Sequence, residues 1–285
     1  MKFVKCLTVA VTAVTLGVIC AVCASAATIY KSPDGNFEYT IGSDGNITIG
    51  SYIGKGGEAA VPSAIGGRKV TKLANTFNGS SVTSVTIPDG ITELGEYVFS
   101  TCDNLTTVKL PSTITVIPKS AFAYCPKLTT VTIPENVTTI DDKAFYSCEG
   151  LTSIKIPSKV SYIGAQAFYY CRSLTGIAIP AGITAVNDST FSSCLKLEKV
   201  TLPSTVTSIE YSAFFQCLSL SSINLPANLE EISDNAFYFC DALDNITIPS
   251  KVKYIGDYAF GSCASLSKIN IPASVKSIGN NAFPV

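Results

Sequence analysis

Eight cysteines recur at a constant interval of 23 residues, with no insertion or deletion between them. They are Cys102, Cys125, Cys148, Cys171, Cys194, Cys217, Cys240 and Cys263. A fixed period of this length is typical of a repeat solenoid, in which each repeat is one structural unit that stacks on the next. The period therefore predicts the architecture, and it favours an extended interaction surface over a single pocket.

Each unit follows the pattern C-x-x-L-x-x-V-x-I-P-x-x-V-x-x-I-x-x-x-A-F-x-x. In the unit that begins at Cys125, Val131 and Ile133 alternate with two threonines, which predicts a short strand with one apolar face. Stacked copies of this strand would form a parallel sheet. The proline that follows ends each strand, because it has no N–H to donate.

The second half of each unit supplies more core residues. The V-x-x-I segment returns two apolar side chains to the core, and the x-x-A-F-x-x-C segment predicts a short helical turn that buries Ala and Phe. One unit cannot bury these groups without neighbours. We therefore expect a parallel-β repeat solenoid with short helical turns and about nine 23-residue units over residues 79–285.

Residues 27–78 depart from the repeat. Alternating apolar residues over 37–41 and 47–49 flank the turn sequence G-S-D-G-N at 42–46, which predicts a β-hairpin. We expect this hairpin, with a degenerate first repeat, to cap the first coil, because an uncovered sheet end invites edge pairing. No such pattern precedes Val285, so the last coil is expected to be uncapped and open to self-association.

The first 26 residues are expected to be a signal peptide. Lys2 and Lys5 form a positive n-region, residues 6–22 are largely apolar, and Ala-Ser-Ala at 24–26 is a small-residue cleavage site. A membrane anchor is the alternative interpretation, but no stop-transfer flank follows. No second apolar run of spanning length is present. The mature chain is therefore expected to lack a transmembrane segment and to be secreted or held at the cell surface.

Composition argues against several function classes. The chain has no histidine, which excludes histidine bases, triads and metal ligands. With 20 basic and 21 acidic residues, no basic excess points to nucleic acid. The carboxylate pairs at 141–142 and 230–231 are most simply solvated turn residues. We therefore expect no enzyme activity, no metal site and no cofactor.

The even number of repeat cysteines in an exported chain raises the alternatives of disulfides or a metal site. Equivalent residues in stacked coils lie one strand spacing apart, about 4.7–4.9 Å. Parallel side chains keep the Cβ atoms equally far apart, beyond the roughly 3.5–4.5 Å of a disulfide, and a linear ladder does not converge on a metal. We therefore expect a buried ladder of free thiols.

Three motifs carry a family resemblance: L-x-x-V-x-L-P at 105–111, A-F-x-x-C at 121–125, and D-G-N-I-T-I at 44–49. On these motifs, over residues 35–285, the chain resembles the BspA-like leucine-rich repeat family. The resemblance implies a curved solenoid with its parallel sheet on the concave face. It also implies a secreted or cell-surface protein, often one that adheres to host proteins or other cells, and it supplies no catalytic residues.

The outward strand positions would line that concave face. They carry no acid and no aromatic residue, which favours a shallow, mildly basic groove for an acidic protein segment or a glycan. The alternative is that these residues have only a structural role, because Thr has a high strand propensity and Lys keeps exposed strands soluble. The candidate ligand-binding residues are Thr107, Lys109, Thr130, Thr132, Lys155, Lys199, Thr201, Asn224, Asn245 and Lys268.

An aromatic stripe precedes the cysteines as a second candidate surface. Its members are Tyr124, Tyr146, Tyr169, Tyr170, Phe215, Tyr238 and Phe239, and the five tyrosines are the candidate binding residues. Aromatic rows can stack on sugars or anchor a protein partner, and the alternative is that they cover the edge of the phenylalanine column.

The leading functional hypothesis is a non-enzymatic adhesion or binding protein whose partner is an extracellular protein or a cell-surface glycan, not nucleic acid. Repeated weak contacts along a solenoid suit such binding through avidity. The alternatives are a carbohydrate-binding module that uses the aromatic stripe, and a structural envelope protein that self-associates.

Overall fold

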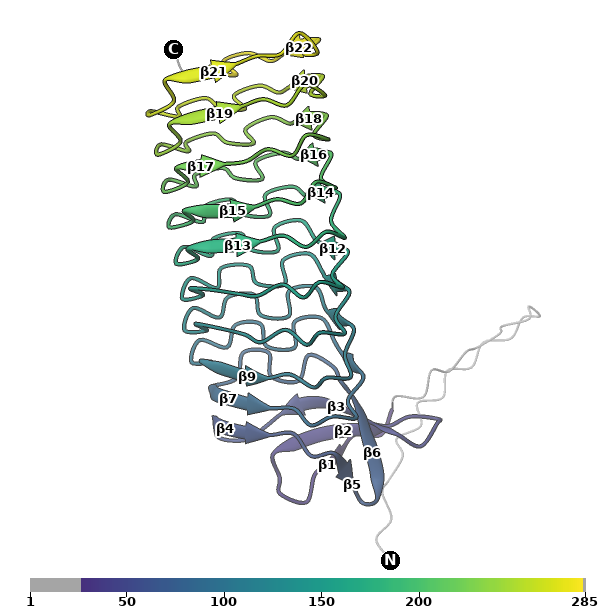
Figure 1. Cartoon of the computed structure of the whole chain (residues 1–285). Coiled ribbons are helices and arrows are strands. Elements are labelled where there is room, and N and C mark those ends of the chain that lie inside the picture. The colour runs from purple at the N-terminus through teal and green to yellow at the C-terminus, as the bar shows by residue number, and fades with distance from the viewer. Residues whose placement is uncertain (1–26, 284–285) are drawn as a thin grey trace, which may run out of the picture.

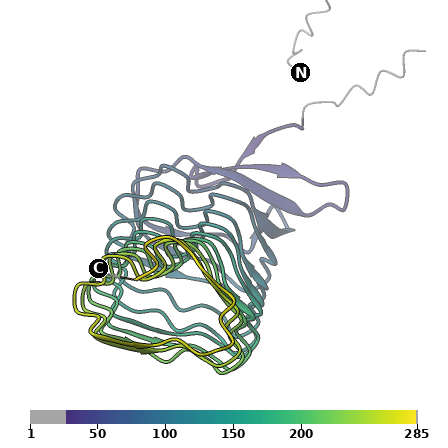
Figure 2. The ribbon, with the colours of Figure 1, turned by 90° about the horizontal axis from the view of Figure 1, so that it is seen from above.

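The computed structural model describes residues 27–283 as a column of stacked coils (Figure 1). Viewed from above, successive coils follow nearly the same closed outline (Figure 2). The predicted signal peptide, residues 1–26, lies outside the described residues. The described residues form a solenoid of parallel strands, as the repeat period predicted.

The L-x-x-V-x-I segment builds the first ladder of parallel strands. Its strands are β4 (Gly57–Ala60), β7 (Val82–Thr86), β9 (Thr107–Lys109), β13 (Gly176–Ala178), β15 (Lys199–Thr201), β17 (Ser222–Ile223), β19 (Asn245–Thr247) and β21 (Lys268–Asn270). Between β9 and β13 the strand predicted around Val131 and Ile133 is reduced to one bridge, Thr132 to Lys155. Both apolar side chains stay buried there, so core packing holds the coil in place where ladder pairing is weak.

The V-x-x-I segment builds a second ladder that the sequence did not predict. Its strands are β8 (Glu93–Leu94), β10 (Val116–Ile117), β11 (Thr139–Ile140), β12 (Tyr162–Ile163), β14 (Ala185–Val186), β16 (Ser208–Ile209), β18 (Glu231–Ile232), β20 (Tyr254–Ile255) and β22 (Ser277–Ile278). These strands are two residues long, too short to show an alternating pattern. Their pairing depends on the coil above and the coil below.

The expected helical turn at the Ala-Phe motif is wrong, because the described residues contain no helix. In the unit that begins at Cys102, Ser120 (φ 54°) and Tyr124 (φ 59°) flank this motif in the left-handed region, and the same two positions recur along the solenoid. A left-handed residue reverses the backbone, so a helix cannot propagate. Alternate N–H groups then point along the solenoid axis, and that of Phe122 donates to the Ala144 carbonyl at 2.8 Å.

The phenylalanines of successive coils stack into a continuous column. Neighbouring ring centroids lie 5.1–5.8 Å apart, with interplanar angles of 2–13°. The rings belong to Phe77, Phe99, Phe122, Phe145, Phe168, Phe191, Phe214, Phe237, Phe260 and Phe283. The described solenoid therefore has about ten turns, one more than the sequence predicted, because Phe77 adds a ring from the degenerate first repeat.

All eight repeat cysteines are free and buried, which confirms the predicted ladder of thiols. Each thiol donates to the carbonyl of the stacked phenylalanine one coil before. For Cys125 the Sγ atom lies 3.0 Å from the Phe99 oxygen, and the other seven distances fall between 2.9 and 3.2 Å. A thiol is small and apolar yet can donate a weak hydrogen bond, so it satisfies a buried carbonyl without importing a strongly polar group.

These thiols make stability sensitive to alkaline pH. Burial raises the pKa of Cys148 to about 12, from an ordinary value near 9.0. Below about pH 9 the thiol is protonated in both states and adds no pH dependence. Between about pH 9 and 12 it ionises only in the unfolded chain, so the free energy of unfolding falls by about 1.4 kcal/mol per pH unit per such thiol. We expect Cys148→Ala to reduce this pH-dependent decline by the contribution of one thiol, as measured by urea unfolding at several pH values. An unchanged dependence of the free energy of unfolding on pH would contradict the role given to the Cys148 thiol.

The N-terminal hairpin is present and joined to the solenoid. Strand β2 (Phe37–Ile41) pairs antiparallel with β3 (Ile47–Tyr52), and β3 pairs parallel with β6 (Arg68–Leu73). Two short strands, β1 (Tyr30–Lys31) and β5 (Ala64–Ile65), pair with β2 and β6. The hairpin therefore extends the second ladder.

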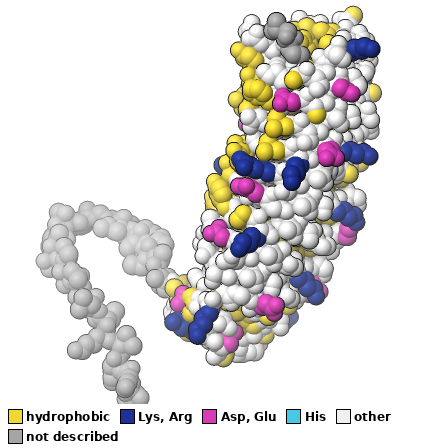
Figure 3. Space-filling model, turned by 90° about the vertical axis from the view of Figure 1, so that its left-hand side faces the viewer, with side chains coloured by type: hydrophobic (Ala, Val, Ile, Leu, Met, Phe, Trp, Pro, Cys, Tyr) yellow, Lys and Arg dark blue, Asp and Glu magenta, His cyan; other side chains and the backbone are white. Residues whose placement is uncertain are grey.

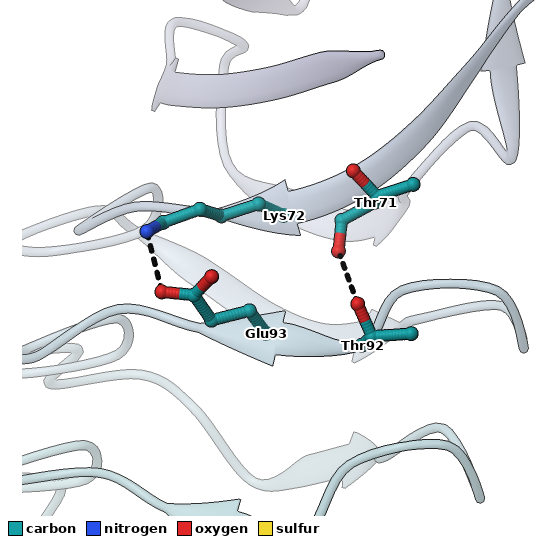
Figure 4. Close-up of polar contacts among 4 residues, drawn as sticks. All are labelled: Thr71, Lys72, Thr92 and Glu93. Carbon is teal, nitrogen blue, oxygen red and sulfur yellow. Dashed lines mark hydrogen bonds and ion pairs between the residues drawn. The ribbon is translucent and has the colours of Figure 1, made fainter. Parts of the chain in front are cut away.

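Side chains reinforce the junction between the cap and the first coil. Strand β6 pairs parallel with β8, the Lys72 ammonium pairs with the Glu93 carboxylate, and the Thr92 hydroxyl donates to the Thr71 carbonyl at 3.4 Å (Figure 4). The edge of Phe37 also meets Phe77 at a centroid distance of 6.2 Å, so the cap closes one end of the ring column.

Candidate functional site

The outward positions of the first ladder form one exposed surface, which we call the strand face. Every candidate ligand-binding residue predicted for these positions is exposed and lies on it: Thr107, Lys109, Thr130, Thr132, Lys155, Lys199, Thr201, Asn224, Asn245 and Lys268. They come from seven of eight successive repeat coils, because the fourth coil carries only Gly176 and Ala178 at these positions. The structure thus places residues that are far apart in the sequence in one row along the solenoid.

The strand face is hollowed between β17 and β19, which are neighbours without ladder pairing. A depression of about 300 Å³ there includes Asn224 and Asn245 among its lining residues. A second, of about 560 Å³, shares Asn245 with the first and reaches Lys268. The two depressions therefore form a continuous shallow surface over three coils. Another, of about 390 Å³, lies around Thr130 and Lys155.

Charge on the strand face is not uniform. The strand positions carry no acid, but Glu135, from the adjacent connection, places its carboxylate 2.9 Å from the Lys155 ammonium. Both side chains are exposed, so the pair contributes little to stability, yet it offsets the positive charge of this coil. Among the described residues Lys109, Lys199 and Lys268 form no ion pair. The basic character of the face therefore rests on these three lysines.

The carboxylate pairs have structural roles that the sequence did not predict. Asp142 is half-buried, and its Oδ1 accepts the Ala165 N–H of the next coil at 2.9 Å. Glu230 forms an ion pair with Lys253 at 2.5 Å, and this pairing lowers the pKa of the Glu230 carboxyl. The interpretation as solvated turn residues is therefore wrong for Asp142, since its carboxylate links two coils.

The predicted aromatic stripe is divided into two clusters. Tyr124, Tyr146, Tyr169 and Tyr170 form the first, in which Tyr146 and Tyr169 stack at 4.8 Å and 11°. Partial burial, with Tyr124 and Tyr169 beside it, raises the pKa of the Tyr146 hydroxyl. The Arg172 guanidinium lies 4.3 Å from the Tyr170 ring centroid, within cation–π range. These rings pack against one another, which reduces the ring surface that a ligand could contact.

Tyr238 belongs to the second cluster. Its ring lies 4.3 Å from Phe239, 5.5 Å from Tyr258 and 5.8 Å from Phe215. Tyr258 lies outside the predicted stripe, because it stands five residues before its cysteine and only the cross-coil packing brings it to Tyr238.

Figure 3 shows a column of hydrophobic side chains along one edge of the solenoid, with charges of both signs scattered beside it.

Residues 27–283 hold no group of three or more potential metal-ligating side chains close enough to bind an ion. The same part of the chain has no helix long and apolar enough to cross a membrane.

A family model described as the BspA type leucine-rich repeat region, in six copies, matches residues 73–198 and 162–284, well over half of the chain. The chain belongs to the BspA-type leucine-rich repeat family. Membership agrees with the stacked 23-residue coils and confirms the resemblance seen in the sequence motifs. BspA-type repeats form a general interaction and surface family, and the matching models indicate no enzyme family.

Two solved leucine-rich repeat proteins show the same fold. One, from T. pallidum, is 29% identical with a TM-score of 0.61, over 67% of this chain and 91% of its own. Another, from Eubacterium ventriosum, is 22% identical with a TM-score of 0.59, over 90% of this chain and 99% of its own. A search of curated proteins found no significant match.

Proposed function

We propose that this BspA-type repeat protein is an exported, non-catalytic scaffold that binds an extracellular protein through its strand face. The observation that carries the proposal is the row of ten exposed Thr, Lys and Asn side chains, drawn from successive coils. A row of this kind offers many weak contacts that add through avidity when the partner is extended or repetitive. The predicted signal peptide and the family membership support export to the outside of the cell.

The partner's chemistry follows from the same face. Lys199 and Lys268 supply unpaired positive charge, and the amides of Asn224 and Asn245 line the depressions between them. The described strand positions carry no large aromatic anchor, so binding should depend on polar contacts and on the area covered. These features favour an extended acidic segment, and electrostatic attraction should speed its association.

The test is surface plasmon resonance against a panel of extracellular-matrix proteins, with a double variant, Lys199→Glu and Lys268→Glu. We expect at least tenfold weaker binding to the recognised protein, mainly through slower association, and a reduced dependence on salt. The matched control is Lys143→Glu with Lys276→Glu, which makes the same charge change away from the strand face. Equal loss in both variants, or saturable binding untouched by the first, would contradict the proposal.

The two alternative functions that the sequence suggested, carbohydrate binding and self-association, remain predictions. Carbohydrate binding by the first aromatic cluster would have to use ring surface left free by the Tyr146–Tyr169 stack. Self-association as an envelope component predicts a concentration-dependent mass in sedimentation, and a strand-face variant should leave that mass unchanged.

A further inference from the structure

The second aromatic cluster borders an open depression of about 590 Å³. Its aromatic lining includes Tyr238, Phe239 and Tyr258, and its polar lining includes Asp241 and Asn281. The volume falls within the roughly 300–1,000 Å³ range of small-molecule sites. This surface is separate from the strand face, so the inference drawn from it does not rest on the proposed protein binding.

Gly261 lines this depression beside the Tyr238 ring. Two residues before the cysteine, two coils carry Tyr146 and Tyr169, whose rings stack on one another. At the equivalent position the coil of Cys263 carries Gly261, so no ring from that position covers Tyr238. A Cβ at Gly261 would lie 3.1 Å from the Tyr238 ring, which shows that this ring leans over the glycine backbone. The Tyr238 ring therefore has no aromatic neighbour from this position in the coil of Cys263, where the depression lies.

Two of the aromatic residues that line the depression have a left-handed backbone conformation, which is unfavourable for bulky side chains. Phe239 and Tyr258 have φ values of 60° and 55°, in the left-handed region that bulky side chains rarely adopt. Other coils carry both kinds of residue there: Tyr124 and Ser262 stand at the Phe239 position, and Tyr97 and Ser212 stand at the Tyr258 position. The fold needs the left-handed conformation but not the aromatic rings. With Tyr238, these two rings place three aromatic side chains around one depression.

We propose that this depression binds a neutral sugar residue of an extracellular glycan. The apolar face of a pyranose ring can stack on an aromatic face, here that of Tyr238 or Tyr258. The Asp241 carboxylate can accept hydrogen bonds from sugar hydroxyls, and the Asn281 amide can both donate and accept them. The described lining has no Lys or Arg, so the Asp241 charge selects against acidic sugars.

The test is an amide-shift NMR titration of the ¹⁵N-labelled protein. Maltose, cellobiose, lactose and chitobiose serve as neutral probes, and N-acetylneuraminic acid serves as the acidic probe. We expect at least one neutral disaccharide to cause saturable shifts at the amides of Gly261, Ser262 and Asn281, and the acidic sugar to cause none. No saturable shift with any neutral probe would overturn the proposal, and so would equal shifts with the acidic sugar.

Two variants locate the site. We expect Tyr258→Ala and Tyr238→Ala each to weaken binding at least tenfold. Tyr258 is 40% exposed, so its removal should leave the fold intact even if Tyr238→Ala does not. The matched control is Tyr211→Ala, which removes a ring that is 51% exposed and outside the depression, and should bind normally. Undiminished binding by Tyr258→Ala, with the fold verified by its amide spectrum, would overturn the assignment. The strand-face lysine double variant should bind the sugar normally, which separates this test from that of the protein partner.

Discussion

Phe191→Ala is expected to lower the free energy of unfolding by about 3–5 kcal/mol. The Phe191 ring lies within the column, 5.5 Å from Phe168 on one side and 5.5 Å from Phe214 on the other. The side chain is 1% exposed, so its removal leaves a cavity between coils that the backbone ladders hold at a fixed spacing. Because each coil contacts mainly its neighbours, the loss should fall on the interfaces that this coil makes. Urea unfolding followed by circular dichroism measures it.

The control for this prediction is Phe215→Ala, which removes a half-buried phenylalanine from the neighbouring coil. It lies outside the stacked column and should cost clearly less. If Phe191→Ala cost under about 1 kcal/mol, the column would not be the main support of the core, since a buried Phe ordinarily contributes several times that amount.

Gly256→Ala is expected to destabilise the solenoid by about 1–3 kcal/mol or more, through a clash between coils. An added Cβ would lie 2.3 Å from the Asp234 Oδ1 and 2.4 Å from the Asp234 backbone nitrogen. The carboxylate cannot simply move away, because it accepts the Asp257 N–H at 2.8 Å and so joins the two coils. The backbone must therefore shift, or this hydrogen bond must break. Urea unfolding of the variant measures the cost.

Gly176→Ala is the matched control for this substitution. A Cβ there would lie 3.4 Å from the nearest atom, the Lys199 carbonyl oxygen, which is ordinary contact, and the position is partly exposed. We expect a change within about 0.5 kcal/mol. Equal destabilisation by the two variants would show that the effect comes from backbone propensity and not from the contact with Asp234.

Most of the repeat could be predicted because its features recur at one fixed period. The phenylalanine column and the thiol ladder each follow from one residue type at 23-residue intervals, since equivalent residues of stacked coils must lie next to each other. The hairpin at 37–49 could be predicted for a local reason, because alternating residues flank a turn sequence. The family resemblance rests on the same motifs, and it proved correct.

The turn around Ala121 and Phe122 could not be predicted, because its apolar spacing is the same as that of a short helix. What distinguishes it is the left-handed backbone of Ser120 and Tyr124, and neither residue type demands that conformation. The carbonyls of the next coil select it, since they accept the N–H groups that the turn directs along the axis. Only the stacked neighbour supplies those acceptors.

The sequence by itself determined the solenoid, its core residues and the family, because apolar residues that must be buried recur at the same positions of each repeat. The tertiary structure alone decided the second ladder, the contact between Gly256 and Asp234, and the opening beside Tyr238 at Gly261. Each of these depends on the contact between residues of adjacent coils that are about one repeat apart in sequence. The properties of a single coil do not specify such a contact, because it forms only when the neighbouring coil is in place.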